Sequence, residues 1–224
     1  MKKLTFLSIL LIGLVAEQGW AEDAVSTYLS GPHAYVSFDA GTSQIYTSTF
    51  SPNIYPSTTR SVYQPDVGGA IGILAFNPDH PSMALGAEFG MSTYGQITQT
   101  GSNLDSGNAS QVKIGSTATD LMAVGRFTFI PAFFTTVKVG AAYVVQNVSV
   151  NDQSSTDGDF SYNVSNNRVA PALGVGVGAN FTPHLSASLD AGYIFGKRPD
   201  MNNPNTYNQG AAISSLNATI SYLF

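Results

Sequence analysis

The strongest constraint on the fold is a two-residue alternation, which is clearest at the end of the chain, over residues 216–224. Side chains of one parity are apolar there, and those of the other parity are mostly polar. The apolar parity comprises Leu216, Ala218, Ile220, Tyr222 and Phe224. Because successive side chains of a β-strand point to opposite faces, this pattern predicts a strand with one apolar face.

Earlier segments share this alternation, and together with the last one they predict eight strands. These segments are 34–40, 67–76, 83–92, 120–129, 136–146, 169–181 and 185–193. The expected connections alternate between long polar loops (42–66, 95–116, 147–167 and 197–211) and short turns (77–82, 130–132 and 182–184). An even number of strands joined in this way is typical of an antiparallel up-and-down β-barrel.

The first residues have the composition of a secretory signal peptide. Two lysines precede the apolar run 4–16, and small residues lead to a cleavage point after Ala21. A membrane anchor is the alternative, but the run is shorter than the ~20 residues that a spanning helix needs. We therefore expect 1–21 to be a cleaved signal peptide, 22–31 a periplasmic lead-in and 32–224 the barrel domain.

The polar parity distinguishes a membrane barrel from a soluble one. A lipocalin-like barrel turns its apolar face inward to a ligand and would carry many Lys and Glu outside. Here only 10% of the residues are charged, and the polar parity is mostly Gly, Ala, Ser and Thr. A soluble β-sandwich is a further alternative, but it gains little from ending on Phe224, whereas a membrane barrel can place that ring at the lipid interface. The sequence therefore predicts an all-β, eight-stranded antiparallel up-and-down transmembrane β-barrel in the outer membrane of a Gram-negative cell.

Charge and cysteine content exclude several functions. The formal net charge is −5, and it becomes more negative when residues 1–21 are removed. This balance disfavours nucleic acid as a partner. The absence of cysteine excludes thiolate metal sites and cysteine nucleophiles. We expect neither a cofactor nor a metal.

Five charged residues fall on the polar parity of the predicted strands, at similar heights. They are Asp39, Glu88, Arg126, Lys138 and Asp190. An eight-stranded barrel is only wide enough inside for side chains, and buried charges must be paired to offset their desolvation. We therefore expect Arg126 and Lys138 to pair with Glu88, Asp39 and Asp190 in one interior layer. This layer would close the lumen, as a structural plug or as a gate.

The mature chain resembles the small OmpA-like outer-membrane β-barrel family, in a single-domain form. The resemblance rests on the eight strand patterns, on the opening segment 35–41 and on the ending 220–224. It implies that Ile220, Tyr222 and Phe224 form a C-terminal signal read by the barrel-assembly machinery. It also implies a monomer surrounded by outer-membrane lipids, with an interior salt-bridge network.

Two other clusters suggest chemistry but do not fit it. His184 and Ser186 have the spacing of a lipid A deacylase pair, but the topology places His184 in a periplasmic turn and Ser186 inside the barrel. Asp152, Asp157 and Asp159 lack the Gly and Glu of a helix-loop-helix calcium site, so we expect a solvated acidic loop. An omptin-like protease would need ten strands. We therefore expect no enzymatic activity.

The leading hypothesis is a non-enzymatic surface barrel that contributes to membrane integrity. Its four long loops are rich in Tyr, Ser, Thr and Asn, a composition typical of adaptable contact surfaces. They would serve adhesion or other contacts with a host or surface ligand. The competing hypothesis is a narrow channel, or a carrier that holds a small solute or an apolar ligand in a glycine-lined lumen.

Overall fold

The computed structural model describes residues 31–77, 80–103, 108–153, 158–206 and 209–224. The strands are β1 (Gly31–Ile45), β2 (Ser57–Arg60), β3 (Gln64–Asn77), β4 (His80–Asn103), β5 (Asn108–Ile130), β6 (Phe133–Gln153), β7 (Phe160–Asn180), β8 (Leu185–Ile194) and β9 (Ile213–Leu223). One short 3₁₀ helix, Pro204–Thr206, precedes β9. No helix in these ranges is long and apolar enough to cross a membrane. The expected signal peptide lies outside the described residues.

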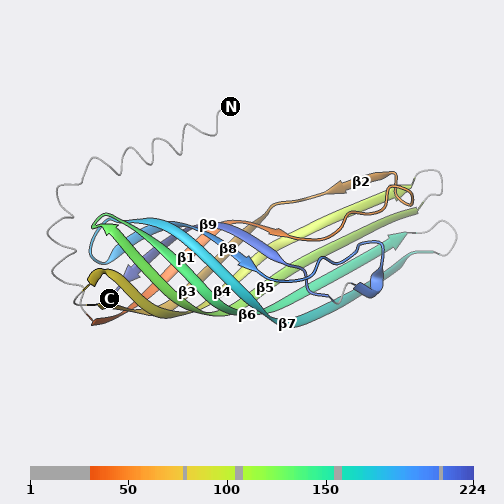
Figure 1. Cartoon of the computed structure of the whole chain (residues 1–224). Helices are drawn as coiled ribbons and strands as arrows, with labels where there is room; N and C mark the ends of the chain where they lie inside the picture. Colours follow the sequence, from red (N-terminus) through yellow and green to blue (C-terminus); the bar gives the residue numbers. More distant parts are fainter. Residues whose placement is uncertain (1–30, 78–79, 104–107, 154–157, 207–208) are drawn as a thin grey trace, which may run out of the picture.

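Eight of the strands form a closed ring (Figure 1). Its order is β1, β3, β4, β5, β6, β7, β8 and β9, with each strand antiparallel to the next. The last strand pairs back with the first, from Tyr35–Leu223 to Ile45–Ile213. The predicted eight-stranded barrel and its predicted closure are therefore confirmed. The short strand β2 stands outside the ring and pairs with β4.

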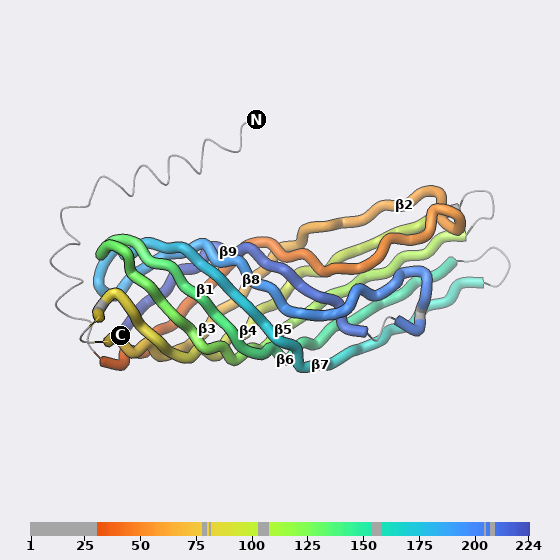
Figure 2. The backbone as a smooth tube through the Cα atoms, viewed as in Figure 1, coloured from red at the N-terminus to blue at the C-terminus, as the bar shows by residue number. Residues whose placement is uncertain are grey.

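The outward parity of the ring is apolar. Phe38 is 69% exposed, Leu121 is 64% exposed and Ile220 is 60% exposed, whereas the residues next to each of them in the sequence point into the lumen. The C-terminus lies at the end of the barrel that carries the short turns (Figure 2), and the ring centres of Tyr222 and Phe224 lie 5.1 Å apart. The predicted apolar faces thus form a continuous belt that suits contact with lipid.

The predicted loops 95–116 and 147–167 are wrong for most of their length, because strands run through them. β4 and β5 remain paired up to Asn103 and Asn108, and β6 and β7 remain paired up to Asp152 and Phe160. Both hairpins continue far beyond the ring, at the end opposite the short turns (Figure 1). We refer to these four strand ends and β2 as the extension.

The two other predicted loops differ from each other. The expected loop 42–66 contains the end of β1, all of β2 and the start of β3. Over its described residues, the expected loop 197–211 is confirmed as a connection without a β-strand between β8 and β9, with the short 3₁₀ helix and one bridge between Lys197 and Ala211.

The alternation in the extension has the opposite polarity, because this part of the wall faces water instead of lipid. Along β5, Val112 and Ile114 point inward and are buried, while the residues between and beside them are polar. Within the ring, the outward-pointing residue on the same strand is instead apolar, as Leu121 shows. On β4 the parity itself shifts at an irregularity between Tyr94 and Ile97.

The apolar core of the ring continues into the extension. Phe50 and Met201, from the β1–β2 and β8–β9 connections, are buried in the same cluster as Ile97 and Val150 from the strands. Hydrogen bonds join the two connections, for example from the Arg198 side chain to the Thr47 carbonyl at 3.0 Å. The extension is therefore a packed unit, and its surface is held in a defined shape.

The register of the closing pair can be tested with cysteines, which the chain lacks. Ala40 and Ala218 lie opposite each other on β1 and β9, at the short Cα separation that a disulfide needs. The double variant Ala40→Cys/Ala218→Cys is expected to crosslink fully under mild oxidation, as measured by the mobility of a protease-cleaved sample. Ala40→Cys/Tyr222→Cys offsets the pair by four residues, or ~13 Å, and should not crosslink. Equal crosslinking of both variants would contradict the register.

Candidate functional site

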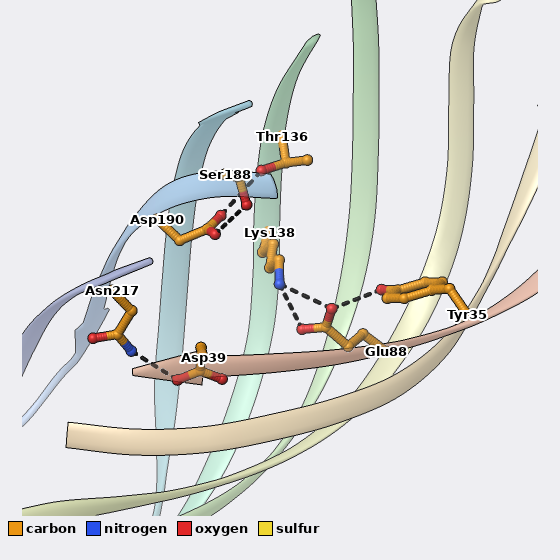
Figure 3. A network of polar contacts seen from close by, with 8 residues as sticks. All are labelled: Tyr35, Asp39, Glu88, Thr136, Lys138, Ser188, Asp190 and Asn217. Atoms are coloured by element: carbon orange, nitrogen blue, oxygen red, sulfur yellow. Dashed lines mark hydrogen bonds and ion pairs between the residues drawn. The ribbon is translucent and has the colours of Figure 1, made fainter. Parts of the chain in front are cut away.

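An ion pair lies in the lumen between β6 and β4. The Lys138 ammonium donates to Glu88 Oε1 at 2.7 Å and to Oε2 at 2.8 Å. The Tyr35 hydroxyl on β1 donates to the same Oε2 at 2.6 Å (Figure 3). Glu88 is only 6% exposed, so these charge-assisted bonds offset the desolvation of its carboxylate. The predicted pairing of Lys138 with Glu88 is confirmed, and its role as plug or gate stays a prediction.

Interior glycines make room for this arrangement. Gly72 lies between Tyr35 and Glu88 in a cross-strand row. A Cβ atom at Gly72 would lie 2.5 Å from the Tyr35 ring, so any side chain there would push the ring away from Glu88. Gly176 lies between Thr136 and Asp190 in the same way, and a Cβ atom there would collide with the Asp190 carboxylate.

The predicted pairing of Arg126 with a carboxylate is wrong. Its guanidinium donates to the Asn180 side chain at 2.5 Å, and it stacks 3.7 Å from the centre of the Phe134 ring. Asn180 in turn donates to the Pro131 carbonyl in the β5–β6 turn at 2.9 Å. Arg126 therefore binds the groups that fill the short-turn end, and only a small cavity separates it from Glu88 and Lys138.

The remaining two predicted carboxylates bind polar side chains and not cations. Asp39 accepts a hydrogen bond from the Asn217 amide at 2.9 Å, and the same amide donates to Asp66 at 3.2 Å. Asp190 accepts from the Ser188 hydroxyl at 2.6 Å (Figure 3). The lysine–glutamate pair is the one salt bridge among the described residues. The expected single layer of ion pairs is thus a broader polar network with one ion pair.

Sequence reasoning missed several members of this network. Tyr35 and Asn217 lie on the polar parities of segments 34–40 and 216–224 but carry no charge, and Asp66 lies in the expected loop 42–66. Asp120 lines the same cavity as Asp39. Parity is the sequence signal that finds Asp66. It precedes the inward-facing Gly68 by two residues, so its side chain also points into the lumen.

Buried apolar side chains line the lumen between the charged network and the extension. Ile45, Ile213 and Ile194 lie side by side in one row and are at most 6% exposed. A cavity of about 120 Å³ lies below them, beside the ion pair. A second cavity of about 40 Å³ surrounds Arg126. Both are well below the ~300 Å³ of a typical small-molecule site.

The two clusters that resembled catalytic or metal sites lie apart from this network or at its edge. His184 lies in the β7–β8 turn, and its Nδ1 donates to the Leu223 carbonyl at 2.7 Å. Ser186 is buried and lines the smaller cavity. Asp152 and Asp159 lie at the tip of the extension, and Asp157 lies outside the described residues.

The ion pair can be tested by double-mutant analysis. Lys138→Met leaves the Glu88 carboxylate buried without its cation, so we expect a loss of about 3 kcal/mol in unfolding free energy. In Glu88→Gln/Lys138→Met both charges are absent, and the loss should be smaller than the sum of the two single losses. Urea unfolding in lipid vesicles, followed by gel mobility, measures each value. Lys113→Met on the outer wall is the matched control, and an equal loss there would contradict the role of the pair.

Comparisons with known proteins agree with this architecture. A family model described as the outer membrane protein β-barrel domain matches residues 6–224. A search of curated proteins found no match.

Several solved structures are similar to the chain. Ail, the attachment invasion locus protein of Yersinia pestis, is 10% identical, with 88% of this chain and 100% of that chain covered and a TM-score of 0.48. OprG from Pseudomonas aeruginosa is 12% identical, with 89% and 99% covered and a TM-score of 0.47. The outer membrane protease OmpT from Escherichia coli is 13% identical, with 89% and 100% covered and a TM-score of 0.46. Because the family model covers nearly the whole sequence, the chain belongs to the outer membrane protein β-barrel domain family.

Proposed function

We propose that the protein is a non-enzymatic surface barrel of the outer membrane. It contributes to membrane integrity and presents its extension for adhesion or other surface contacts. The observation that carries this proposal is the extension itself, in which four strands and β2 form a packed unit beyond the lipid-facing belt. Integrity in lipid needs the ring alone, so a further packed wall outside the lipid supports a role in contact with other molecules.

The lumen supports a structural role more than transport. The buried row Ile45–Ile213–Ile194 narrows one side of the lumen, and the cavities beside it are too small for most ligands. The burial of Ser186 inside the lumen also removes the deacylase pair from the lipid.

The outward surface of the ring supports the proposed partners. Its apolar belt fits outer-membrane lipids, and its closure within one chain supports a monomer. Ile220, Tyr222 and Phe224 are exposed on the outer face of β9, where the barrel-assembly machinery could read them during insertion. The protein is expected to reach this membrane after cleavage of residues 1–21.

Conductance measurements distinguish the barrel from a channel. The wild-type protein in planar lipid bilayers is expected to give no steady single-channel openings, because buried apolar side chains, the isoleucine row among them, narrow the lumen. Ile45→Gly/Ile213→Gly removes two large side chains from this row and should produce openings. Steady wild-type openings that respond to Arg126→Ala would favour the channel instead.

Shortening the two hairpins tests the contact role. We expect bacteria that display a variant with 97–114 and 148–164 each replaced by a tight turn to lose most of their attachment to cultured cells and matrix-coated surfaces. The ring should still assemble, since its paired strands remain, and heat-dependent gel mobility checks this. Pro183→Ala, in a short turn at the opposite end, is the control. Undiminished attachment by the shortened variant would refute the proposal.

A further inference from the structure

One edge of the sheet in the extension lies open. β7 pairs with β6 from Phe160 to Ala179, but it pairs with β8 only from Ala172 to Asn180. β8 ends at the ring, whereas β7 continues into the extension (Figure 1). Residues 160–170 of β7 therefore have a neighbouring strand on one side only. We refer to their other side as the open edge.

The hydrogen bonds near the ring show which backbone groups face the open edge. The Pro171 carbonyl accepts a bond from the Phe195 amide at 3.0 Å, beside β8. Just beyond β7, the Phe181 amide donates to the Leu185 carbonyl at 2.9 Å, on the same side. Because residues of a strand bond to alternate sides, odd-numbered residues direct their amides and carbonyls to the open edge. Among the described residues, no backbone hydrogen bond reaches them there. They are Ser161, Asn163, Ser165, Asn167 and Val169.

The open edge lacks the features that usually protect a strand edge in water. Natural proteins place charged residues, proline or bulges along exposed edges. Between Phe160 and Asn167 the sequence has no charged residue and no proline, and pairing with β6 continues there without a register shift. The strand β2 at the opposite edge of this sheet is different, because it has four residues, follows Pro56 and ends on Arg60. The open edge is thus able to accept a further strand.

A further strand would cover apolar side chains that the sheet leaves partly exposed. On β5 and β6, which have a neighbour on both sides, the inward-facing Val112 and Val150 are 1% exposed. On β7, the inward-facing Tyr162 and Val164 are only partly buried. Phe160 has the same parity and is 61% exposed. Alternate side chains of an added strand would pack against this row on one face of the sheet.

Charges at the two ends of the open edge give the added strand a direction. At the tip, Asp152 lies opposite Phe160. At the ring, Arg168 forms no salt bridge with any described carboxylate. These charges match a strand with a basic residue at the tip and an acidic residue at the ring. Because β7 runs from the tip to the ring, an antiparallel partner begins with its acidic residue and ends with its basic one.

We propose that the open edge binds an extended segment of a partner protein, which joins the sheet as an antiparallel strand. Backbone hydrogen bonds to the odd-numbered residues supply affinity, and alternate apolar side chains of the segment pack on Tyr162 and Val164. The inference rests on the proposed function, since it names the kind of partner that the same surface contacts.

A designed peptide tests the open edge directly. The probe has nine residues, Glu-Thr-Val-Thr-Val-Thr-Val-Thr-Lys, to lie opposite 160–168, and a fluorescent label. It is titrated against the protein in lipid nanodiscs. The same peptide with Glu and Lys exchanged is the control, and we expect it to bind about threefold more weakly or less well still. Binding of the probe should also slow hydrogen exchange of the amides of Ser161, Asn163 and Ser165.

A pair of substitutions at one position separates the backbone from the side chain. Asn163→Pro removes an amide donor from the open edge and leaves the pairing with β6 intact, because that amide faces away from β6. We expect it to weaken binding of the probe about tenfold. Asn163→Ala keeps the amide and should bind like the wild type. Heat-dependent gel mobility checks that both variants fold.

Four outcomes would overturn the open edge as a binding site for a partner protein. They are no binding of the probe at millimolar concentration, equal binding by Asn163→Pro and the wild type, and unchanged hydrogen exchange at the edge. The fourth is a disulfide between two molecules of Asn163→Cys, which would make a second copy of the chain the occupant.

Attachment of displaying bacteria separates failure of this inference from failure of the proposed function. If Asn163→Pro attaches normally while the variant with shortened hairpins does not, the open edge is not the contact site and the contact role stands. If the variant with shortened hairpins also attaches normally, the proposed function itself is wrong.

Discussion

The pairing of β9 with β1 is the contact on which the rest of the molecule depends. It runs from Tyr35–Leu223 to Ile45–Ile213, and the Phe224 amide extends it with a hydrogen bond to the Ala34 carbonyl at 2.9 Å. In lipid, an unpaired strand edge would leave its backbone donors and acceptors without partners. Closure removes both edges, and only then can the outer wall consist of exposed Phe, Leu, Ile and Val side chains.

Closure with eight strands also dictates what the inside can contain. The lumen is so narrow that one large side chain needs a glycine beside it, as Tyr35 needs Gly72. A buried carboxylate in this space needs partners to offset its desolvation, which explains why Glu88 receives hydrogen bonds from both Lys138 and Tyr35. The same limit explains Arg126, which finds an amide and an aromatic ring at the short-turn end.

The sequence predicts the membrane part of the fold well and the extension poorly, for one physical reason. In lipid the apolar parity faces outward, and segments such as 83–92 and 216–224 show it without interruption. In water the apolar parity faces inward, so the outer face of 108–116 is polar and the segment has the composition of a loop. The pattern across Val112 and Ile114 still has a period of two. The positions of Lys138 and Glu88 along their strands predict that the two side chains lie close together, as they do. Strand positions alone do not predict that Asn180 and Phe134 occupy the space around Arg126.

The extension also changes what kind of contact surface this barrel offers. Loops of 20 or so residues would have to lose conformational entropy on binding, whereas paired strands have already lost it during folding. Cross-strand rows such as Thr100–Gln111–Asn151–Ser161 hold their side chains at the ~4.8 Å spacing of the sheet. A ligand with repeated polar groups meets donors and acceptors that are already in position. The spacing of these rows depends on the register of β4 to β7, which continues from the closed ring into the extension.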